Sequence, residues 1–172
     1  MTRIFLIGLM GSGKTYWAKK IAAALHWKFA DLDGFIEERE QMSITEIFGR
    51  FGENHFRLLE KKYLEELSRE NKIVVAAGGG TPCFHNNMEV MNKTGETWYL
   101  KVEPALAAQR LKDISRERPL LKNKTGKELA QFLTSQLQRR ERFYLQAKHI
   151  VEEEKLDGKK LTEVFGQAHQ VR

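Results

Sequence analysis

The sequence contains a single cysteine, Cys83, and no long apolar run among its 172 residues. One thiol cannot form an internal disulfide or a cysteine cluster for zinc, so we expect a reducing, cytoplasmic location. The N-terminal apolar run stops at Gly8, which is too short for a signal peptide or a membrane span. We therefore expect no membrane association.

The chain also lacks a block of charge of one sign. It carries 29 Lys and Arg against 23 Asp and Glu, a net charge of +6, and the two signs alternate in stretches such as "EKKYLEE". A positive protein attracts anionic partners, either nucleic acid or small phosphorylated and carboxylated molecules. Because the charges are interleaved, the sequence favours a solvated mixed surface, and we expect no nucleic-acid partner.

Short apolar runs alternate with longer segments of helical spacing. The helical spacing is clear at Phe56, Leu59, Tyr63 and Leu67, which share one face of a predicted helix. This alternation predicts an α/β fold of three layers, with a parallel sheet covered by helices on both faces. The strand-like runs are "RIFLIG", "KFADLD", "KIVVAAG", "TWYLKV" and "HIVEE".

No repeat or linker divides the chain, so we expect one domain over residues 1–172. Two segments fit its core poorly. Residues 34–60 insert short helices between the second and third strands. Residues 112–124 are charged, contain a proline and lack periodicity, which indicates either a plain surface loop or a mobile lid.

The stretch "GLMGSGKT" matches the phosphate-loop pattern G-x-x-x-x-G-K-[ST], between an apolar strand and a helix. Its glycines let backbone N–H groups converge on phosphate oxygens at the start of the helix. Lys14 would reach the β- and γ-phosphates, and the Thr15 hydroxyl would bind Mg²⁺. A chance glycine-rich turn would not account for both the pattern and its context. We expect the nucleotide to contact Gly11, Ser12, Gly13, Lys14, Thr15 and Tyr16.

A guanine-specific GTPase would normally carry N-K-x-D. The stretch "NKTG" begins at Asn92 and again at Asn123, but glycine stands where the aspartate is needed. The sequence therefore disfavours a GTPase and leaves a kinase or an ATPase.

Two carboxylates, Asp31 and Asp33, stand at the end of the second predicted strand. Strand alternation sends both side chains to the same face. They are either solvated turn residues or a functional pair of carboxylates. In a functional pair, one carboxylate binds within the coordination shell of Mg²⁺ and the other accepts a proton from an attacking hydroxyl.

Arg57 and Glu60 lie three residues apart on a predicted helix. They form either a surface ion pair or an arginine held ready for a bidentate carboxylate. The triple glycine at residues 78–80 follows the third strand without a Lys-Ser or Lys-Thr pair. It is therefore expected to hold a second ligand and not the nucleotide phosphates.

Six motifs in order give the chain a family resemblance. The phosphate loop, "DLD", "FRLLE", "GGG", "RPLL" and "RERFY" are spaced as in shikimate kinases, from Arg3 to about Val151. The resemblance implies a five-stranded parallel sheet, a substrate-binding insertion and a lid. It also implies transfer of the ATP γ-phosphate to the 3-hydroxyl of shikimate, on the route to chorismate and the aromatic amino acids.

The same resemblance implies roles for individual residues. Asp33 would bind the shikimate hydroxyls and act as the base, while Asp31 would support Mg²⁺ through water. Gly79 would offer its N–H to a substrate hydroxyl. The remaining implied contacts are Arg57 and Arg140 with the substrate carboxylate, Arg118 as a lid arginine over the phosphates, and Arg110 stacked on adenine.

Two other functions stay open at this point. A kinase for another small hydroxy acid, such as gluconate, would share the phosphate loop, but Arg57, Glu60 and the triple glycine favour shikimate. A regulatory P-loop module that binds nucleic acid would need a basic stripe and salt-sensitive binding. No predicted helix shows an exposed apolar stripe, so we expect a monomer.

Overall fold

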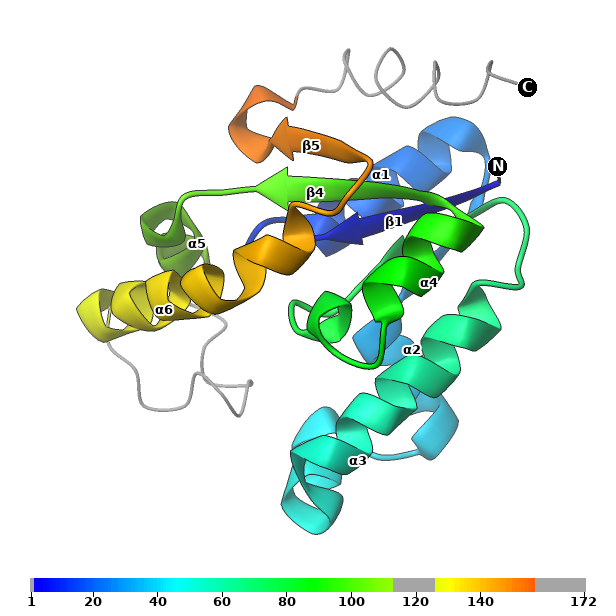
Figure 1. Cartoon of the computed structure of the whole chain (residues 1–172), viewed down its shortest axis with the longest axis horizontal. Helices are drawn as coiled ribbons and strands as arrows, with labels where there is room; N and C mark the ends of the chain where they lie inside the picture. Colours follow the sequence, from blue (N-terminus) through cyan, green and yellow to red (C-terminus); the bar gives the residue numbers. More distant parts are fainter. Residues whose placement is uncertain (1, 113–125, 157–172) are drawn as a thin grey trace.

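The computed structural model of the chain describes residues 2–112 and 126–156 (Figure 1). All five predicted strand segments form strands, and helices connect them. The strands are β1 (Arg3–Ile7), β2 (Lys28–Asp31), β3 (Ile73–Ala76), β4 (Glu96–Lys101) and β5 (His149–Glu152). The helices are α1 (Lys14–Leu25), α2 (Leu32–Glu40), α3 (Ile44–Leu67), α4 (Asn87–Thr94), α5 (Pro104–Leu111) and α6 (Gly126–Tyr144), with 3₁₀ turns η1 (Thr81–Cys83) and η4 (Glu153–Lys155).

The strands form one sheet in the order β2-β3-β1-β4-β5, and every neighbouring pair is parallel. This confirms the predicted α/β fold with a five-stranded parallel sheet flanked by helices. Parallel neighbours need crossover connections, and the long helical segments of the sequence supply them. None of the helices in the described ranges is both long and apolar enough to cross a membrane.

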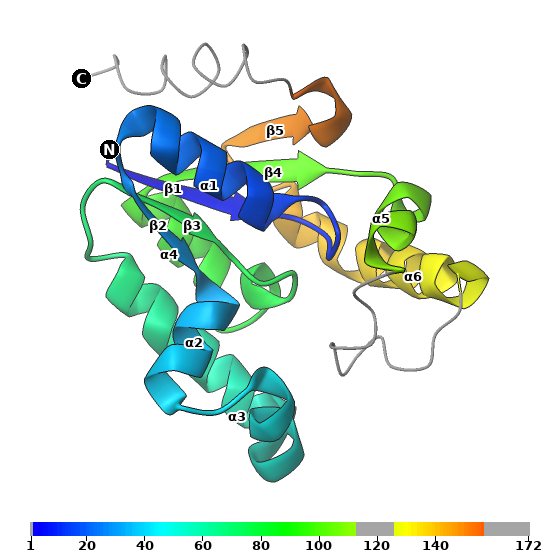
Figure 2. The ribbon, with the colours of Figure 1, turned by 180° about the vertical axis from the view of Figure 1, so that it is seen from behind.

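Both faces of the three central strands, β1, β3 and β4, are buried, as their continuous apolar sequences require. Along β1, Phe5 and Ile7 belong to one core cluster, whereas Ile4 and Leu6 belong to another on the opposite face. Helices α3 and α4 and the end of α6 cover the first face (Figure 1), and α1 covers the second (Figure 2).

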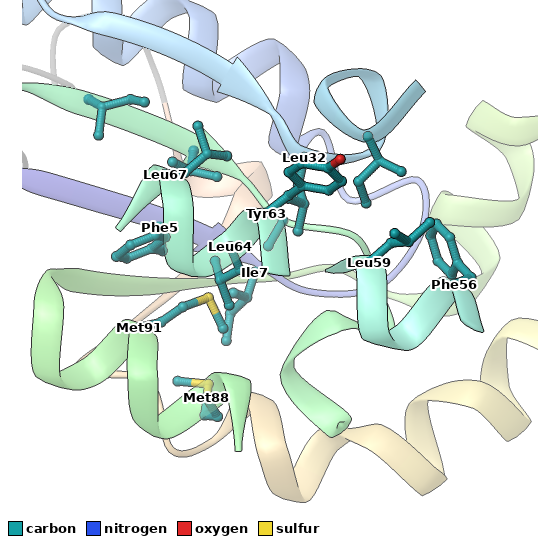
Figure 3. Close-up of a cluster of buried hydrophobic side chains, with 14 of the residues drawn as sticks. Phe5, Ile7, Leu32, Phe56, Leu59, Tyr63, Leu64, Leu67, Met88 and Met91 are labelled. Carbon is teal, nitrogen blue, oxygen red and sulfur yellow. The ribbon is translucent and has the colours of Figure 1, made fainter. Parts of the chain in front are cut away.

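Helix α3 is longer than the short helices expected in residues 34–60, because it continues into the core. It begins at a capping box, in which the Glu46 N–H donates to Ser43 Oγ at 3.2 Å and the Ser43 N–H donates to Glu46 Oε2 at 2.9 Å. Gly52 interrupts it with non-helical φ and ψ of 79° and 174°. Beyond this break, α3 buries one apolar face against the sheet (Figure 3), namely Phe56, Leu59, Tyr63, Leu64 and Leu67.

The ends of β1 and β3 face a crevice. The chain leaves β1 into α1 on one face of the sheet and leaves β3 toward α4 on the other face. Ligands in open parallel sheets bind where neighbouring connections diverge in this way. The phosphate loop follows β1 and the triple glycine follows β3, so both lie at this point.

The expected lid, residues 112–124, lies outside the described residues except for Lys112, which is the C-cap of α5. Arg118 lies outside them as well. Helix α5 begins at Pro104, a residue suited to the first turn of a helix, and packs against α6 through Leu111, Leu129 and Leu133.

Leu64 tests the packing of α3 against the sheet, because its side chain is fully buried beside Ile7 and Met91 (Figure 3). Leu64→Ala should lower the free energy of unfolding by about 2–5 kcal/mol, through lost apolar contact and a residual cavity. Leu58→Ala is the matched control on the same helix, since Leu58 is 53% exposed, and it should change stability by less than about 0.5 kcal/mol. Urea unfolding of both variants measures this difference. Equal losses of unfolding free energy in the two variants would contradict this packing.

Candidate active site

The phosphate loop connects β1 to α1, and its conformation requires glycine. Gly8 has φ of 141°, and an added Cβ there would lie 2.6 Å from the carbonyl oxygen of Leu100. Gly13, with φ of 81°, directly precedes the first turn of α1. The loop therefore brings backbone N–H groups to the N-terminus of a helix, where a phosphate is stabilised.

The side chains of the predicted nucleotide-binding stretch surround this loop. Lys14 Nζ donates to the carbonyl oxygens of Gly8 at 3.0 Å and Leu9 at 2.9 Å. Ser12 is fully buried, and its hydroxyl has no hydrogen-bond partner within the described ranges. Tyr16 is exposed on the first turn of α1.

Asp31 connects the phosphate loop with the start of α2. Thr15 Oγ1 donates to Asp31 Oδ2 at 2.6 Å, and Asp31 Oδ1 accepts the N–H groups of Asp33 at 3.2 Å and Gly34 at 3.4 Å. The expectation that strand alternation aligns Asp31 with Asp33 is wrong, because β2 ends at Asp31 and Asp33 lies in the first helical turn of α2. Helix capping, not the strand, sets their arrangement.

A cavity of about 430 Å³ opens beside the loop. Its polar lining brings together five residues predicted from the sequence, and its apolar wall includes Phe48 and Phe56. The cavity thus combines carboxylates, cations and backbone groups within a space suited to a small polar molecule. The five predicted residues are Asp31, Asp33, Arg57, Gly79 and Arg140.

Arg57 is buried and held by two carboxylates. Its Nη1 donates to Glu60 Oε2 at 2.6 Å, while its Nη2 and Nε donate to Glu53 Oε1 at 2.8 Å and 3.1 Å. Burial lowers the pKa of the guanidinium, but Glu60 and Glu53 raise it more, so the pKa lies above its ordinary value. Of the two interpretations of Arg57 and Glu60, the surface ion pair is wrong, because their side chains are only 5% and 1% exposed.

The triple glycine packs tightly against these charged groups. An added Cβ on Gly80 would lie 2.6 Å from Arg57 Nη1, and one on Gly78 would lie 3.0 Å from both Asp33 Oδ1 and Glu60 Oε1. The Thr81 hydroxyl donates to Glu60 Oε1. Glycine is needed here because the main chain lies where side chains would collide with the charged groups.

Helix α6 supplies Arg140 to the cavity. An added Cβ on Gly79 would lie 3.5 Å from Arg140 Nη1, so this guanidinium borders the glycine turn. The neighbouring Arg139 and Arg142 are exposed. Of the three arginines, Arg140 is the one that lines the cavity, and its role toward a substrate stays a prediction.

Arg110 lies next to the phosphate loop, on α5, in an ion pair. Its Nη2 donates to Glu153 Oε2 at 2.7 Å, and Glu153 Oε1 accepts the indole N–H of Trp17 at 2.8 Å. Its predicted stacking on adenine stays a prediction.

Sequence reasoning missed four residues that shape the site. Glu53 stands four residues before Arg57, a spacing that could have revealed the pair. The other three make contacts across long sequence separations, which no local pattern reveals, although Tyr144 itself belongs to the "RERFY" motif. They are Thr81 on Glu60, Tyr144 on Gly79 and Glu153 on Arg110.

The fold and the site together define a P-loop kinase that acts on a small molecule. A phosphate loop follows the central strand, and a cavity with acidic and basic groups adjoins it. The family model for shikimate kinase matches residues 10–169 of the sequence. The chain belongs to the shikimate kinase family, whose members are ATP-dependent phosphotransferases of the shikimate pathway.

Individual relatives agree with this assignment. The shikimate kinase of Phocaeicola vulgatus is 48% identical over 160 residues, which cover 93% of this chain and 91% of that protein. A crystal structure of shikimate kinase from Bacteroides thetaiotaomicron has a TM-score of 0.90 at 39% identity and covers 96% of this chain and 98% of its own. The Acinetobacter baumannii enzyme, solved in complex with shikimate, has a TM-score of 0.89 at 30% identity and covers 100% of this chain and 96% of its own.

Cys83 follows the glycine turn, partly buried in η1. Burial raises the pKa of its thiol to about 11, although Arg140 and Arg57 oppose the shift. Since the thiolate is the nucleophile, alkylation by iodoacetamide at pH 8 should be at least tenfold slower in the folded protein than in urea, and should accelerate as the pH rises toward 11. Mass spectrometry of the labelled peptide provides the measurement. A thiol that reacted equally fast in both states would contradict the raised pKa.

Proposed function

We propose that the chain transfers the γ-phosphate of ATP to the 3-hydroxyl of shikimate, giving shikimate 3-phosphate and ADP. The observation that carries the proposal is the cavity beside the phosphate loop, where Asp33 shares one space with Arg57 and Arg140. Shikimate is a small anion with several hydroxyls, so it needs cations for its carboxylate and acceptors for its hydroxyls. The similar enzyme of Acinetobacter baumannii was solved in complex with shikimate, which supports the choice of substrate.

Arg57 and Arg140 bind the substrate carboxylate in this proposal. Because Glu60 and Glu53 fix the guanidinium of Arg57 before the substrate arrives, little side-chain freedom is lost on binding. Gly79 donates its N–H to a substrate hydroxyl at the edge of the cavity. These contacts orient the substrate for in-line attack, which is most of what phosphoryl transfer requires of a protein.

Asp33 accepts the proton of the attacking hydroxyl. It lines the cavity, and its carboxylate borders the glycine turn at Gly78. A carboxylate within hydrogen-bond reach of the nucleophile contributes typically 10²–10⁴-fold to such reactions. Asp33 is therefore the proposed base.

The nucleotide lies along the phosphate loop, with Lys14 neutralising the β- and γ-phosphates. The contacts of Lys14 with the carbonyl oxygens of Gly8 and Leu9 keep its ammonium at the loop. Arg110 stacks on adenine, and Arg118 closes over the phosphates from the lid, which also keeps water away from the reacting group.

Thr15 and Asp31 would hold Mg²⁺ beside the phosphates. Their oxygens lie 2.6 Å apart at the N-terminus of α1, and hydroxyl and carboxylate oxygens are the ligands that this cation prefers. Bound there, the cation would neutralise charge that develops on the transferring phosphoryl group. Asp31 would act through water, because it already caps α2. The monomeric state and the cytoplasmic location stay predictions.

ADP release from MgATP, measured in a coupled assay with and without shikimate, tests the proposed function. We expect a rate that depends on shikimate and saturates with it, and little turnover with gluconate, whose flexible chain does not match the preset arginines. Turnover with gluconate but not with shikimate would overturn the substrate assignment and leave the nucleotide site intact.

Asp33→Asn should preserve ATP binding and lower kcat by about 10²-fold or more, because an amide cannot accept the proton. Glu37→Gln is the matched control. Glu37 lines the same cavity, and its carboxylate accepts the N–H of Ile44 at 2.8 Å, a bond that glutamine retains. Steady-state kinetics should give a kcat close to wild type for this control. A kcat near wild type for Asp33→Asn would refute the role of base.

A further inference from the structure

Tyr144 occupies a position that no proposed step uses. It ends α6, is fully buried, and packs its ring against Tyr99 at 5.2 Å between centroids. Its hydroxyl donates to the carbonyl oxygen of Gly79, 65 residues earlier in the chain. A buried side chain of the distant α6 thus bonds directly to the main chain of the glycine turn.

This bond completes the hydrogen bonding of the turn. The carbonyl oxygen of Gly78 accepts the N–H of Thr81 at 3.1 Å, and that of Gly80 accepts the N–H of Cys83 at 2.9 Å. Between them, the carbonyl of Gly79 accepts from Tyr144 instead. Three consecutive glycines have no side chains to restrict their backbone, so each such bond matters for the shape of the turn.

Tyr144 also contacts the second arginine of the cavity. Arg140 precedes it by four residues and therefore lies on the same face of α6. Burial raises the pKa of the Tyr144 phenol, although the positive charge of Arg140 opposes the shift, so the hydroxyl keeps its proton and remains a donor. The Arg140 guanidinium in turn borders Gly79.

We propose that Tyr144 is a positioning residue that sets the distance between two substrate contacts, the Gly79 main chain and the Arg140 guanidinium. This inference rests on the proposed function, in which Gly79 binds a substrate hydroxyl and Arg140 binds the carboxylate. A rigid cyclic substrate needs both partners at a fixed separation. The phenol hydroxyl holds the Gly79 carbonyl, and Gly79 borders the Arg140 guanidinium, so loss of the hydroxyl should alter the position of Gly79 relative to Arg140.

The test compares Tyr144→Phe with Tyr99→Phe. Both variants remove one buried hydroxyl and keep the ring, but the Tyr99 hydroxyl has no hydrogen-bond partner among the described residues. Tyr144→Phe leaves a buried carbonyl without its donor, and it should raise KM for shikimate about tenfold while KM for MgATP stays within about twofold of wild type. Tyr99→Phe should leave both constants close to wild type.

Two results would overturn the proposal. One is an equal rise of both KM values in Tyr144→Phe, which would indicate a purely structural role. The other is a shikimate KM for Tyr144→Phe that matches that of Tyr99→Phe. A double variant with Arg140→Lys tests whether the two residues act together. In the Arg140→Lys background, Tyr144→Phe should raise KM for shikimate by a smaller factor than it does in the wild type. Fully additive effects of the two substitutions on KM for shikimate would show that Tyr144 does not position Arg140.

A readout without substrate separates this inference from the proposed function. The carbonyl ¹³C resonance of Gly79 should shift in Tyr144→Phe and not in Tyr99→Phe, since only the former removes its donor. If wild-type protein turned over another hydroxy acid and not shikimate, the proposed function would fail. The shift of the Gly79 resonance in Tyr144→Phe, together with the change in KM for that acid, would then decide whether Tyr144 is a positioning residue.

Discussion

The buried ion pair between Arg57 and Glu60 is the interaction on which the rest of the site depends. Both side chains are almost completely excluded from water, and their nitrogen and oxygen atoms lie 2.6 Å apart. Removing two charges from water is costly unless they are paired and their remaining bonds are satisfied. Glu60 also accepts from Thr81, and Arg57 also donates to Glu53. The rings of Phe56 and Phe84 lie near the guanidinium, at 5.3 Å and 4.4 Å.

The ion pair explains the position of the glycine turn. Glu60 lies on α3 and Thr81 on η1, so their bond ties the inserted helix to the end of β3. Arg57 fills the space where a side chain at position 80 would stand. The turn, the helix and the arginine are therefore mutually dependent, and the substrate meets a surface that is largely set in advance.

Local sequence patterns are sufficient to predict the sheet and the phosphate loop, because the apolar pattern of strands and the spacing of glycines are properties of neighbouring residues. The expected strand alignment of Asp31 with Asp33 is wrong because it depends on an element boundary, where one residue decides whether a strand or a helix continues. The burial of Arg57 could not be settled from its spacing to Glu60, because it depends on η1 packing over it. The bonds of Tyr144 and Glu153 join residues that are far apart in the chain, and Arg118 lies outside the described residues.

The break at Gly52 divides α3 into two parts with unequal anchorage. Residues 44–51 bury Ile47 and carry the capping box, whereas residues 53–67 bury a full apolar face. Both parts line the cavity, the first through Ile44, Thr45 and Phe48. Segments with few buried contacts open at lower free energy than the core to which they are attached. Amide protons of residues 44–51 should therefore exchange with solvent well before those of residues 56–67, so one wall of the cavity is anchored less firmly than the wall opposite the sheet core.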